Sequence, residues 1–252
     1  MENIGMGLRT TSNNRVSTGI NGFDELIQGG FPKGSITLVS GPPGTGKTIV
    51  CFQYVQAGLS KGEKCLYLTS DERITNLIEQ AQLLGFDFQT PMENGQLQIM
   101  YLDVDKSDVH KDMEEAIRDG HFSRLVLDSL TPLSEVPVWI VDKGKEIIPS
   151  EGSMGTTSYP IESIQATRVH IRRILGILDK EDCTTLVTTE IPEGSRTLSR
   201  DSISEFLVDG ILVLDLDTTM DRRKVTIRKM RGTKHTLKPQ DIEITEGGIK
   251  LR

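Results

Sequence analysis

One segment constrains the fold of this chain more than any other: Gly41-Pro42-Pro43-Gly44-Thr45-Gly46-Lys47-Thr48. It matches the phosphate-loop spacing G-x-x-x-x-G-K-[ST] at every fixed position. The apolar run 36–40 before it predicts a short buried strand, and the run 49–59 after it predicts a helix that stops at Lys61-Gly62. This order of strand, loop and helix predicts an α/β fold with an anion-binding site where the loop enters the helix.

The residue types in this loop suit the binding of phosphate groups. Glycines have no Cβ, so the backbone N–H groups of the loop can close around an anion, and the helix N-terminus adds its partial positive charge. We expect the Lys47 ammonium to reach the β- and γ-phosphates of a nucleotide and the Thr48 hydroxyl to hold Mg²⁺. The residues expected to bind the nucleotide here are Gly41, Gly44, Thr45, Gly46, Lys47 and Thr48.

The composition is that of a soluble globular protein. The chain has 252 residues, of which 36% are hydrophobic and 26% charged, which is typical of a single large α/β domain. No apolar run approaches the roughly 18 residues that a membrane span needs, and the polar start Met1-Glu2-Asn3 is unlike a signal peptide. We therefore expect a cytoplasmic protein with no membrane segment. Cys51, Cys65 and Cys183 are scattered through apolar segments and are expected to be reduced core residues.

The charge distribution leaves two kinds of partner open. The formal net charge of −7 argues against a protein that coats nucleic acid by bulk charge. A basic stretch near the C-terminus can nevertheless contact the phosphates of a nucleotide or of a nucleic acid. Its members are Arg222, Arg223, Lys224, Arg228, Lys229, Arg231, Lys234, His235 and Lys238.

Two acidic residues follow a second predicted strand. Asp71 and Glu72 come directly after the apolar run 64–70, and a helical pattern begins at Ile74. Carboxylates at the carboxyl end of a parallel strand, beside the loop strand, lie where an attacking water would sit. The alternative is an acidic first helical turn that only favours the helix dipole.

Asp128 is the second nucleotide signature. It ends the apolar run 124–127, about 80 residues after the loop, and would accept hydrogen bonds from the hydration shell of Mg²⁺. The pattern is weak alone, but it stands in an alternating series of strands and helices. Further strands are expected at 97–102 and 184–190, helices at 108–119 and 161–180, and a terminal hairpin at 241–245 and 249–251.

Residues 131–160 interrupt this series as a loop and hairpin insertion. The runs 136–141 and 146–148 predict a β-hairpin that carries the single tryptophan, Trp139. Its side chain either packs on its own scaffold or stacks on a base or a partner. In the helix that follows, we expect His170 to be exposed to solvent. Residues 1–14 lack periodicity and predict a flexible tail, so 15–252 is expected to form one domain.

The segment that leads into the phosphate loop resembles a known family. It reads Thr18-Gly19-Ile20-Asn21-Gly22-Phe23-Asp24-Glu25-Leu26, followed by Gly29-Gly30-Phe31-Pro32-Lys33-Gly34. With the loop, it resembles the KaiC and RadA branch of the RecA-type ATPases, and the KaiC-like domain most of all. The resemblance runs from about residue 15 to the C-terminus and is weakest at 131–160. Later matching motifs are Thr188-Thr189-Glu190, Glu205-Phe206 and Lys229-Met230-Arg231-Gly232-Thr233.

The resemblance implies a RecA-type α/β fold, with a mainly parallel twisted sheet flanked by helices and antiparallel C-terminal edge strands. It also implies ATP and Mg²⁺ as ligands and a ring, expected to be a hexamer, with nucleotide at the subunit interfaces. In such rings Lys229 and Arg231 would reach the γ-phosphate bound to the neighbouring subunit. Glu190 would lie on the γ-phosphate side of the site.

Two departures from the family pattern affect the expected chemistry. A glutamate is usual at position 71, and aspartate is one methylene shorter. Either Asp71 or Glu72 therefore orients the water, and slow hydrolysis is compatible with this change. Glu205 and Phe206 stand where the second KaiC domain carries its phosphorylated Ser-Thr pair, so autophosphorylation is not expected.

Three uses of such an ATPase fit the sequence. The first is a regulatory platform whose ATP state controls assembly with protein partners. The second is a RadA-paralog-like accessory of recombination and DNA repair, which would bind single-stranded DNA through the loops 131–160 and 192–201 and the basic stretch. The third is a scaffold that holds ATP with negligible turnover.

Overall fold

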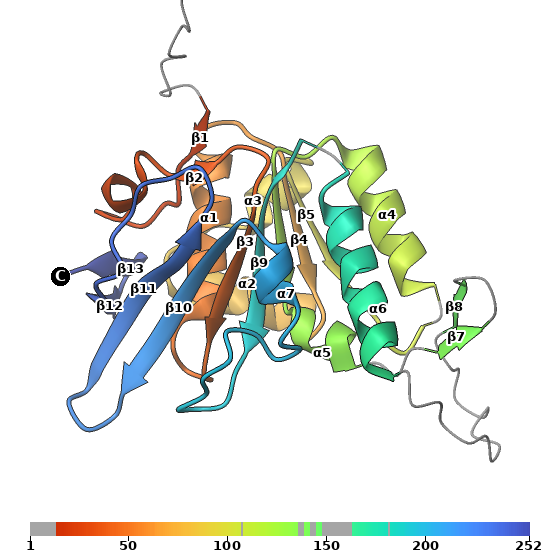
Figure 1. Ribbon diagram of the computed structural model, residues 1–252. Helices are drawn as coiled ribbons and strands as arrows, with labels where there is room; N and C mark the ends of the chain where they lie inside the picture. Colours follow the sequence, from red (N-terminus) through yellow and green to blue (C-terminus); the bar gives the residue numbers. More distant parts are fainter. Residues whose placement is uncertain (1–13, 107, 136–138, 142–144, 148–162, 181) are drawn as a thin grey trace, which may run out of the picture.

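A mixed sheet forms the centre of the protein (Figure 1). The computed structural model describes residues 14–106, 108–135, 139–141, 145–147, 163–180 and 182–252. In spatial order, the nine strands of this sheet are β13 (Gly248–Leu251), β12 (Gln240–Thr245), β11 (Arg222–Met230), β10 (Gly210–Asp217), β3 (Ile36–Gly41), β9 (Thr184–Glu190), β6 (Arg124–Asp128), β4 (Cys65–Thr69) and β5 (Leu97–Tyr101). Strands β10 to β5 are parallel, and β11, β12 and β13 are each antiparallel to their neighbours.

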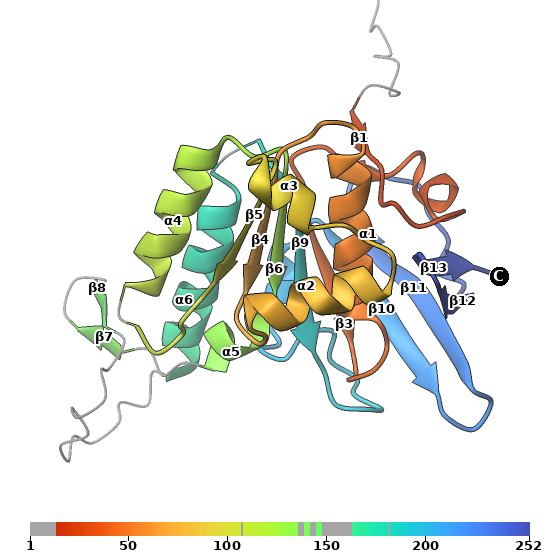
Figure 2. The ribbon, with the colours of Figure 1, turned by 180° about the vertical axis from the view of Figure 1, so that it is seen from behind.

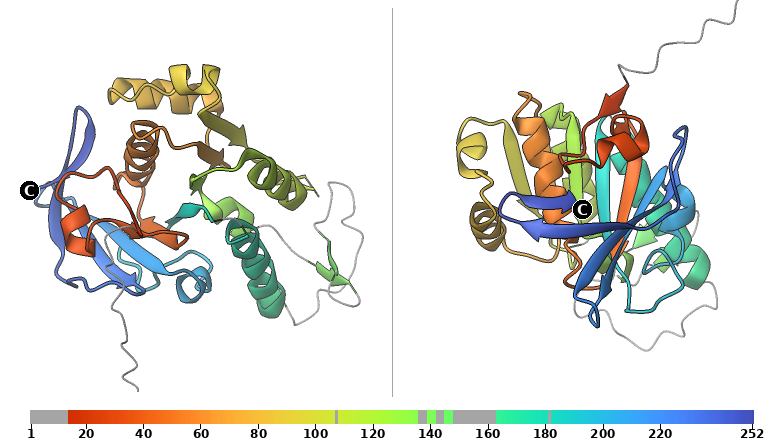
Figure 3. Two further views of the ribbon diagram at one scale, coloured as in Figure 1. Left: turned by 90° about the horizontal axis from the view of Figure 1, so that it is seen from above. Right: turned by 90° about the vertical axis from the view of Figure 1, so that its left-hand side faces the viewer.

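Helices cover both faces of this sheet, as the view from behind and the view from above show (Figures 2 and 3). One face carries α1 (Lys47–Leu59), α2 (Ile74–Leu83) and α3 (Gln89–Glu93). The other carries α4 (Val109–Gly120), α5 (Leu130–Glu135), α6 (Ser163–Leu178) and α7 (Ser204–Leu207). The fold is thus the RecA-type α/β architecture that the family resemblance implies, with an antiparallel C-terminal edge.

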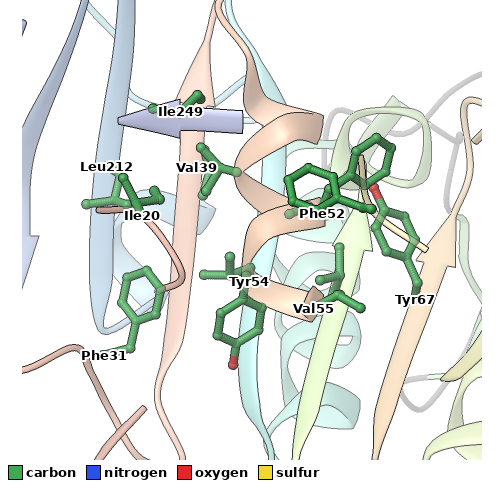
Figure 4. Close-up of a cluster of buried hydrophobic side chains, with 14 of the residues drawn as sticks. Ile20, Phe31, Val39, Phe52, Tyr54, Val55, Tyr67, Leu212 and Ile249 are labelled. Atoms are coloured by element: carbon green, nitrogen blue, oxygen red, sulfur yellow. The ribbon is translucent and has the colours of Figure 1, made fainter. Parts of the chain in front are cut away.

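Each face of the sheet buries its own hydrophobic cluster. Strands β3, β4 and β6 are buried along their whole length, which explains why their sequences are continuous apolar runs. On the α1 face, Phe52 packs edge-on against Phe88, with 5.4 Å between ring centroids, and lies beside Tyr67 of β4 (Figure 4). This aromatic group fixes α1, and with it the end of the phosphate loop, against the sheet.

The segment before the phosphate loop folds back on itself. Strands β1 (Arg15–Val16) and β2 (Phe31–Pro32) pair, and a 3₁₀ turn, η2 (Asp24–Ile27), lies between them. The Asp24 carboxylate accepts hydrogen bonds from the Ser17 hydroxyl at 2.7 Å and the Thr18 backbone N–H at 2.9 Å. This lead segment is therefore structural: it packs next to α1 and contributes no side chain to the cavity at the phosphate loop.

The predicted position of the acidic pair relative to the loop strand is wrong. Strand β4 does not lie beside β3, because β9 and β6 come between them. The order of the strands across the sheet depends on the connections between them, and hydrophobic periodicity carries no information about that order. Asp71 and Glu72 nevertheless stay at the same end of the sheet as the loop, since all these strands are parallel.

Two other expectations are corrected, and two helices were not predicted. The helices α3 and α5 are too short to show a periodic pattern. The alternating run 223–235 predicts an edge-like strand, but β11 is an interior strand between β10 and β12, and β13 and β5 form the edges. His170 is 1% exposed, because α6 packs on α4 as well as on the sheet. Its ring lies edge-on to His110 at 4.8 Å between centroids, and its Nε2–H donates to the Leu133 carbonyl at 2.8 Å.

Part of the expected tail and insertion lies outside the described residues, namely 1–13, 136–138, 142–144 and 148–162. Strands β7 (Trp139–Val141) and β8 (Lys145–Ile147) pair in the antiparallel manner predicted for the hairpin. The side chain of Trp139 is outside the described part, so its packing or stacking role stays a prediction. The division into a tail and a single domain at 15–252 also stays a prediction.

Arg124 is a fully buried arginine that ties three segments together. It lies at the start of β6, pairs with Glu63, and donates to the carbonyls of Ser17 at 2.7 Å and Tyr54 at 2.8 Å. Its guanidinium also stacks over the Tyr54 ring at 4.6 Å. A Cβ at Gly58 would come within 2.5 Å of the Arg124 Cδ, so α1 needs a glycine there.

We predict that Arg124→Met lowers the free energy of unfolding by about 3 kcal/mol, because two buried carbonyls and the Glu63 carboxylate lose their donor. Urea unfolding followed by circular dichroism measures this loss. The matched control is Arg118→Met on α4, where the arginine is exposed and pairs with the exposed Asp119, and no resolvable change is expected. Equal unfolding midpoints for the two variants would contradict the role of Arg124.

Candidate functional site

The phosphate loop links β3 to α1 at the carboxyl edge of the sheet. Gly46 has φ 100°, a left-handed backbone that favours glycine, and α1 begins at Lys47. The Lys47 Nζ donates to the carbonyls of Gly41 at 3.0 Å and Pro42 at 3.1 Å, and it lies 3.6 Å from Glu190 Oε1. The ammonium is thus held inside the loop by carbonyl and carboxylate oxygens, the same kind of acceptor that a phosphate offers.

Asp128 receives hydrogen bonds from three separate elements. Its Oδ2 accepts from the Thr48 hydroxyl at 2.9 Å and from the Tyr67 hydroxyl at 2.6 Å. Its Oδ1 accepts from the Thr188 hydroxyl. The carboxylate is therefore fixed relative to the loop, to β4 and to β9 at once. Burial, followed by the nearby Asp128 charge, raises the pKa of Tyr67, so this hydroxyl stays a donor.

Asp71 and Glu72 point to different partners. The Ser129 hydroxyl donates to Asp71 Oδ2 at 2.7 Å, next to Asp128. The Glu72 carboxylate instead accepts from the Gln80 side-chain amide of α2 at 2.8 and 3.0 Å. Burial is the largest cause that raises the pKa of Asp71, and the charges of Asp128, Glu190 and Glu72 act in the same direction, whereas the Ser129 hydrogen bond lowers it.

One cavity of about 530 Å³ collects these groups. The aliphatic side chains of Ile49, Leu77 and Ile244 line part of it, and they suit a nucleobase or ribose better than phosphate. The remaining lining residues are Pro43, Gly44, Gly46, Lys47, Thr48, Thr69, Asp71, Glu72, Asp128, Ser129 and Glu190. The structure thus brings together the phosphate loop, Asp128 and both acidic candidates.

The donor set beside the loop suits Mg²⁺. The Thr48 hydroxyl and the Asp128 carboxylate are hydrogen-bonded to each other, so both can face one hard cation. Mg²⁺ is usually held by one or two protein oxygens, with water and phosphate oxygens completing its shell. Thr48 and Asp128 would supply that limited set, and the described residues contain no cluster of three or more histidine, cysteine or acidic groups that could replace it.

Lys229 and Arg231 lie away from this cavity. The Lys229 Nζ donates to the carbonyls of Val208 at 2.6 Å and Glu205 at 3.2 Å, and Arg231 pairs with Asp209 at 3.0 Å. These contacts are at the start of β10, which lies beside the start of β3, whereas the phosphate loop follows the end of β3. Within one chain, the pair therefore lies near the amino end of β3, whereas the phosphate loop follows its carboxyl end.

Sequence reasoning missed two residues that contact the site, Tyr67 and Ser129, and it included Thr188 only as part of the motif Thr188-Thr189-Glu190, without its contact to Asp128. Tyr67 and Thr188 resemble ordinary residues of a buried strand, and their meeting with Asp128 depends on β9, β6 and β4 being neighbours. Ser129 follows Asp128 directly, and that adjacency was a usable signal. Arg223 of the basic stretch was singled out, and its Nε donates to the Gly44 carbonyl of the loop at 3.3 Å.

Comparison with known proteins decides the family. A family model described as "ATPase: KaiC" matches residues 16–138 and 153–252. The chain belongs to the KaiC family of ATPases. The KaiC-type motifs and the RecA-type fold inferred from sequence are thereby confirmed at the level of the family.

Three relatives illustrate the range of this KaiC family. A UPF0273 protein of Methanopyrus kandleri is 30% identical, and the match covers 94% of this chain and 91% of that protein. The circadian clock oscillator protein KaiC 1 of Synechocystis is 32% identical over 94% of this chain but only 44% of its own length. The crystal structure of a KaiC-like protein from Pyrococcus horikoshii matches with a TM-score of 0.76 and 32% identity, covering 94% of this chain and 98% of the other.

Two further features of this KaiC-family chain bear on earlier expectations. Cys51, Cys65 and Cys183 are buried, as predicted for core residues. Among the described helices, none combines the length and the apolar character needed to cross a membrane.

We predict that Tyr67→Phe lowers the free energy of unfolding by about 2 kcal/mol, because a buried carboxylate loses one of its charge-assisted donors. Thermal and urea unfolding, followed by far-ultraviolet circular dichroism, measure the loss. The control is Tyr101→Phe at the half-exposed end of β5, which should leave the unfolding midpoint unchanged. If both variants behave alike, the Tyr67 hydroxyl does not support Asp128.

Proposed function

We propose that this protein binds ATP with Mg²⁺ in the loop cavity and hydrolyses it. The observation that carries the proposal is the meeting of Lys47, Thr48 and Asp128 at one edge of the sheet, joined by the 2.9 Å hydrogen bond between Thr48 and Asp128. Membership of a family of ATPases supports the same reaction. The proposed enzyme is a nucleoside-triphosphate hydrolase, and the cytoplasm is its proposed compartment.

Each residue has a separate task in this proposal. Loop N–H groups and the Lys47 ammonium bind the phosphates, and Lys47 exchanges its present carbonyl and Glu190 contacts for phosphate oxygens. Thr48 and Asp128 hold Mg²⁺, which neutralises charge on the transferred phosphoryl group. Asp71 orients the attacking water, because its carboxylate faces the cavity beside Ser129, while the Glu72 carboxylate is engaged by Gln80.

We further propose that the active form is a ring, a hexamer, with ATP at the interfaces between subunits. Lys229 and Arg231 lie at the edge of the sheet opposite to their own loop, so they contact ATP only if they face the loop of another copy. In that arrangement they would stabilise negative charge on the γ-phosphate, as an arginine finger does.

The favoured use of this cycle is the control of assembly with protein partners. Five members of the basic stretch already face partner groups within the chain: Arg231 pairs with Asp209, Lys229 and Arg223 donate to carbonyls, and Lys224 and Arg222 lie opposite Asp215 and Asp217 on β10. Groups already engaged in this way are poor contacts for a nucleic acid backbone.

Binding of single-stranded DNA by a RadA-paralog-like repair protein is the second candidate, and the exposed Arg196 in the loop after β9 favours it. A salt titration separates the two uses, because contacts to DNA phosphates weaken steeply as salt rises. The third candidate, an ATP-holding scaffold with negligible turnover, rests on the short side chain of Asp71. Stoichiometric ATP binding without phosphate release would favour it.

We predict that Lys47→Ala abolishes ATP binding, because the loop loses its cation for the β- and γ-phosphates. Isothermal titration with Mg²⁺-ATP measures the affinity, and phosphate release measures turnover. The control is Lys61→Ala after α1, an exposed lysine outside the cavity, which should bind ATP normally. Undiminished binding by the Lys47→Ala protein would contradict the assignment of the site.

We predict that Lys47→Ala and Arg231→Ala proteins, each defective alone, recover hydrolysis when mixed. A mixed ring contains interfaces in which an intact loop of one subunit meets an intact Arg231 of the next. Light scattering with and without Mg²⁺-ATP establishes the ring mass, and phosphate release across mixing ratios measures the recovery. A monomeric mass under both conditions, or no recovery in mixed rings, would remove the role in trans.

A further inference from the structure

Ser129 is locked in place by the neighbouring strand end. Its backbone N–H donates to the Ser70 hydroxyl oxygen at 3.1 Å, and the Ser70 hydroxyl donates to the Ser129 carbonyl at 2.8 Å. The Ser70 N–H in turn donates to the Asp128 carbonyl at 3.0 Å. Ser129 is 1% exposed. Residue 129 therefore has a fixed position relative to both β4 and β6.

The Ser129 side chain in turn holds the Asp71 carboxylate. Its hydroxyl donates to Asp71 Oδ2 at 2.7 Å, and among the described residues it is the one hydrogen-bond donor to that carboxylate. One oxygen of Asp71 is thus anchored, and the other is left to accept a proton from a water in the cavity. Both Ser129 and Asp71 line that cavity.

The anchor matters because Asp71 sits among negative charges. Burial and the charges of Asp128, Glu190 and Glu72 favour its protonated form, and the Ser129 hydrogen bond favours the ionised form. Among the described residues that line the cavity, Lys47 is the one cation, and it pairs with Glu190. Only an ionised carboxylate can accept a proton from water, so the Ser129 hydroxyl supports both the orientation and the charge of Asp71.

We propose that Ser129 is a positioning residue for ATP hydrolysis, which acts by holding the Asp71 carboxylate toward the attacking water. The inference rests on the proposed ATPase function and assigns no contact between Ser129 and ATP. In the step concerned, the water oxygen forms a bond to the γ-phosphorus, the bond from that phosphorus to the bridging oxygen of ADP breaks, and the water proton passes to Asp71.

The test compares Ser129→Ala with the unaltered full-length protein. We expect kcat to fall about 10- to 100-fold while the dissociation constant for Mg²⁺-ATP stays within about twofold, because a displaced base slows the chemical step only. Ser129→Thr keeps the hydroxyl and is expected to retain most of kcat. Gln80→Ala releases Glu72 instead of Asp71 and is the matched control, with kcat unchanged.

A double-mutant cycle tests whether Ser129 acts through Asp71. Asp71→Asn alone should lower kcat about 100-fold or more, and adding Ser129→Ala should cause no further loss. The pH profile gives a second readout. In Ser129→Ala, the acid limb of kcat should move to higher pH, because the hydrogen bond that favours the ionised carboxylate is gone. A merely structural role would lower the melting temperature without moving this limb.

The outcomes separate this inference from the proposed function. If the unaltered protein binds ATP but releases no phosphate, both fall. If the unaltered protein hydrolyses ATP and Ser129→Ala does so equally well, or loses ATP binding together with kcat, the positioning role alone is overturned. Should Ser129→Ala fail to fold, Ser129→Cys, a weaker donor of similar size, replaces it, and an unshifted acid limb there would count against the role.

Discussion

The buried carboxylate of Asp128 is the constraint on which the functional end of this protein depends. A buried charge is costly unless hydrogen bonds compensate it, and here the donors come from three elements: Thr48 of α1, Tyr67 of β4 and Thr188 of β9. The hydrogen bonds to this one carboxylate therefore fix α1, the end of β4 and β9 relative to one another. The contacts between Ser70 and Ser129, and between Ser129 and Asp71, also fix Asp71 relative to the end of β6.

The electrostatics of the cavity explain why the proposed reaction needs outside cations. Four acidic side chains, those of Asp71, Glu72, Asp128 and Glu190, line it, and Lys47 is the one cationic lining residue among those the structure describes. A triphosphate placed there would meet net repulsion. Mg²⁺ held by Thr48 and Asp128 reduces that repulsion, and Lys229 and Arg231 of another copy would reduce it further. The charge balance thus favours a site completed by a metal ion and by a second subunit.

Within one chain, the phosphate loop and the pair Lys229 and Arg231 are separated by the full length of strand β3. The loop follows the end of β3, and Lys229 and Arg231 lie beside its start, so one chain cannot use both at a single nucleotide. Arg124 plays the matching structural part at that opposite edge, where it joins the lead segment, α1 and β6 without reaching the cavity.

The sequence alone determined the features that depend on short-range pattern. The phosphate loop, the alternation of strands and helices, Asp128, and the acids after β4 were all readable, because each is a local motif beside an apolar run. Tertiary structure decided what depends on strand order: that β9 and β6 separate β3 from β4, that Tyr67 and Thr188 reach Asp128, and that His170 is buried against α4. It also gave two adjacent acids different partners, since the Ser129 hydroxyl donates to Asp71 and the Gln80 amide donates to Glu72. These contacts join residues far apart in the chain, and no local pattern specifies which strands become neighbours.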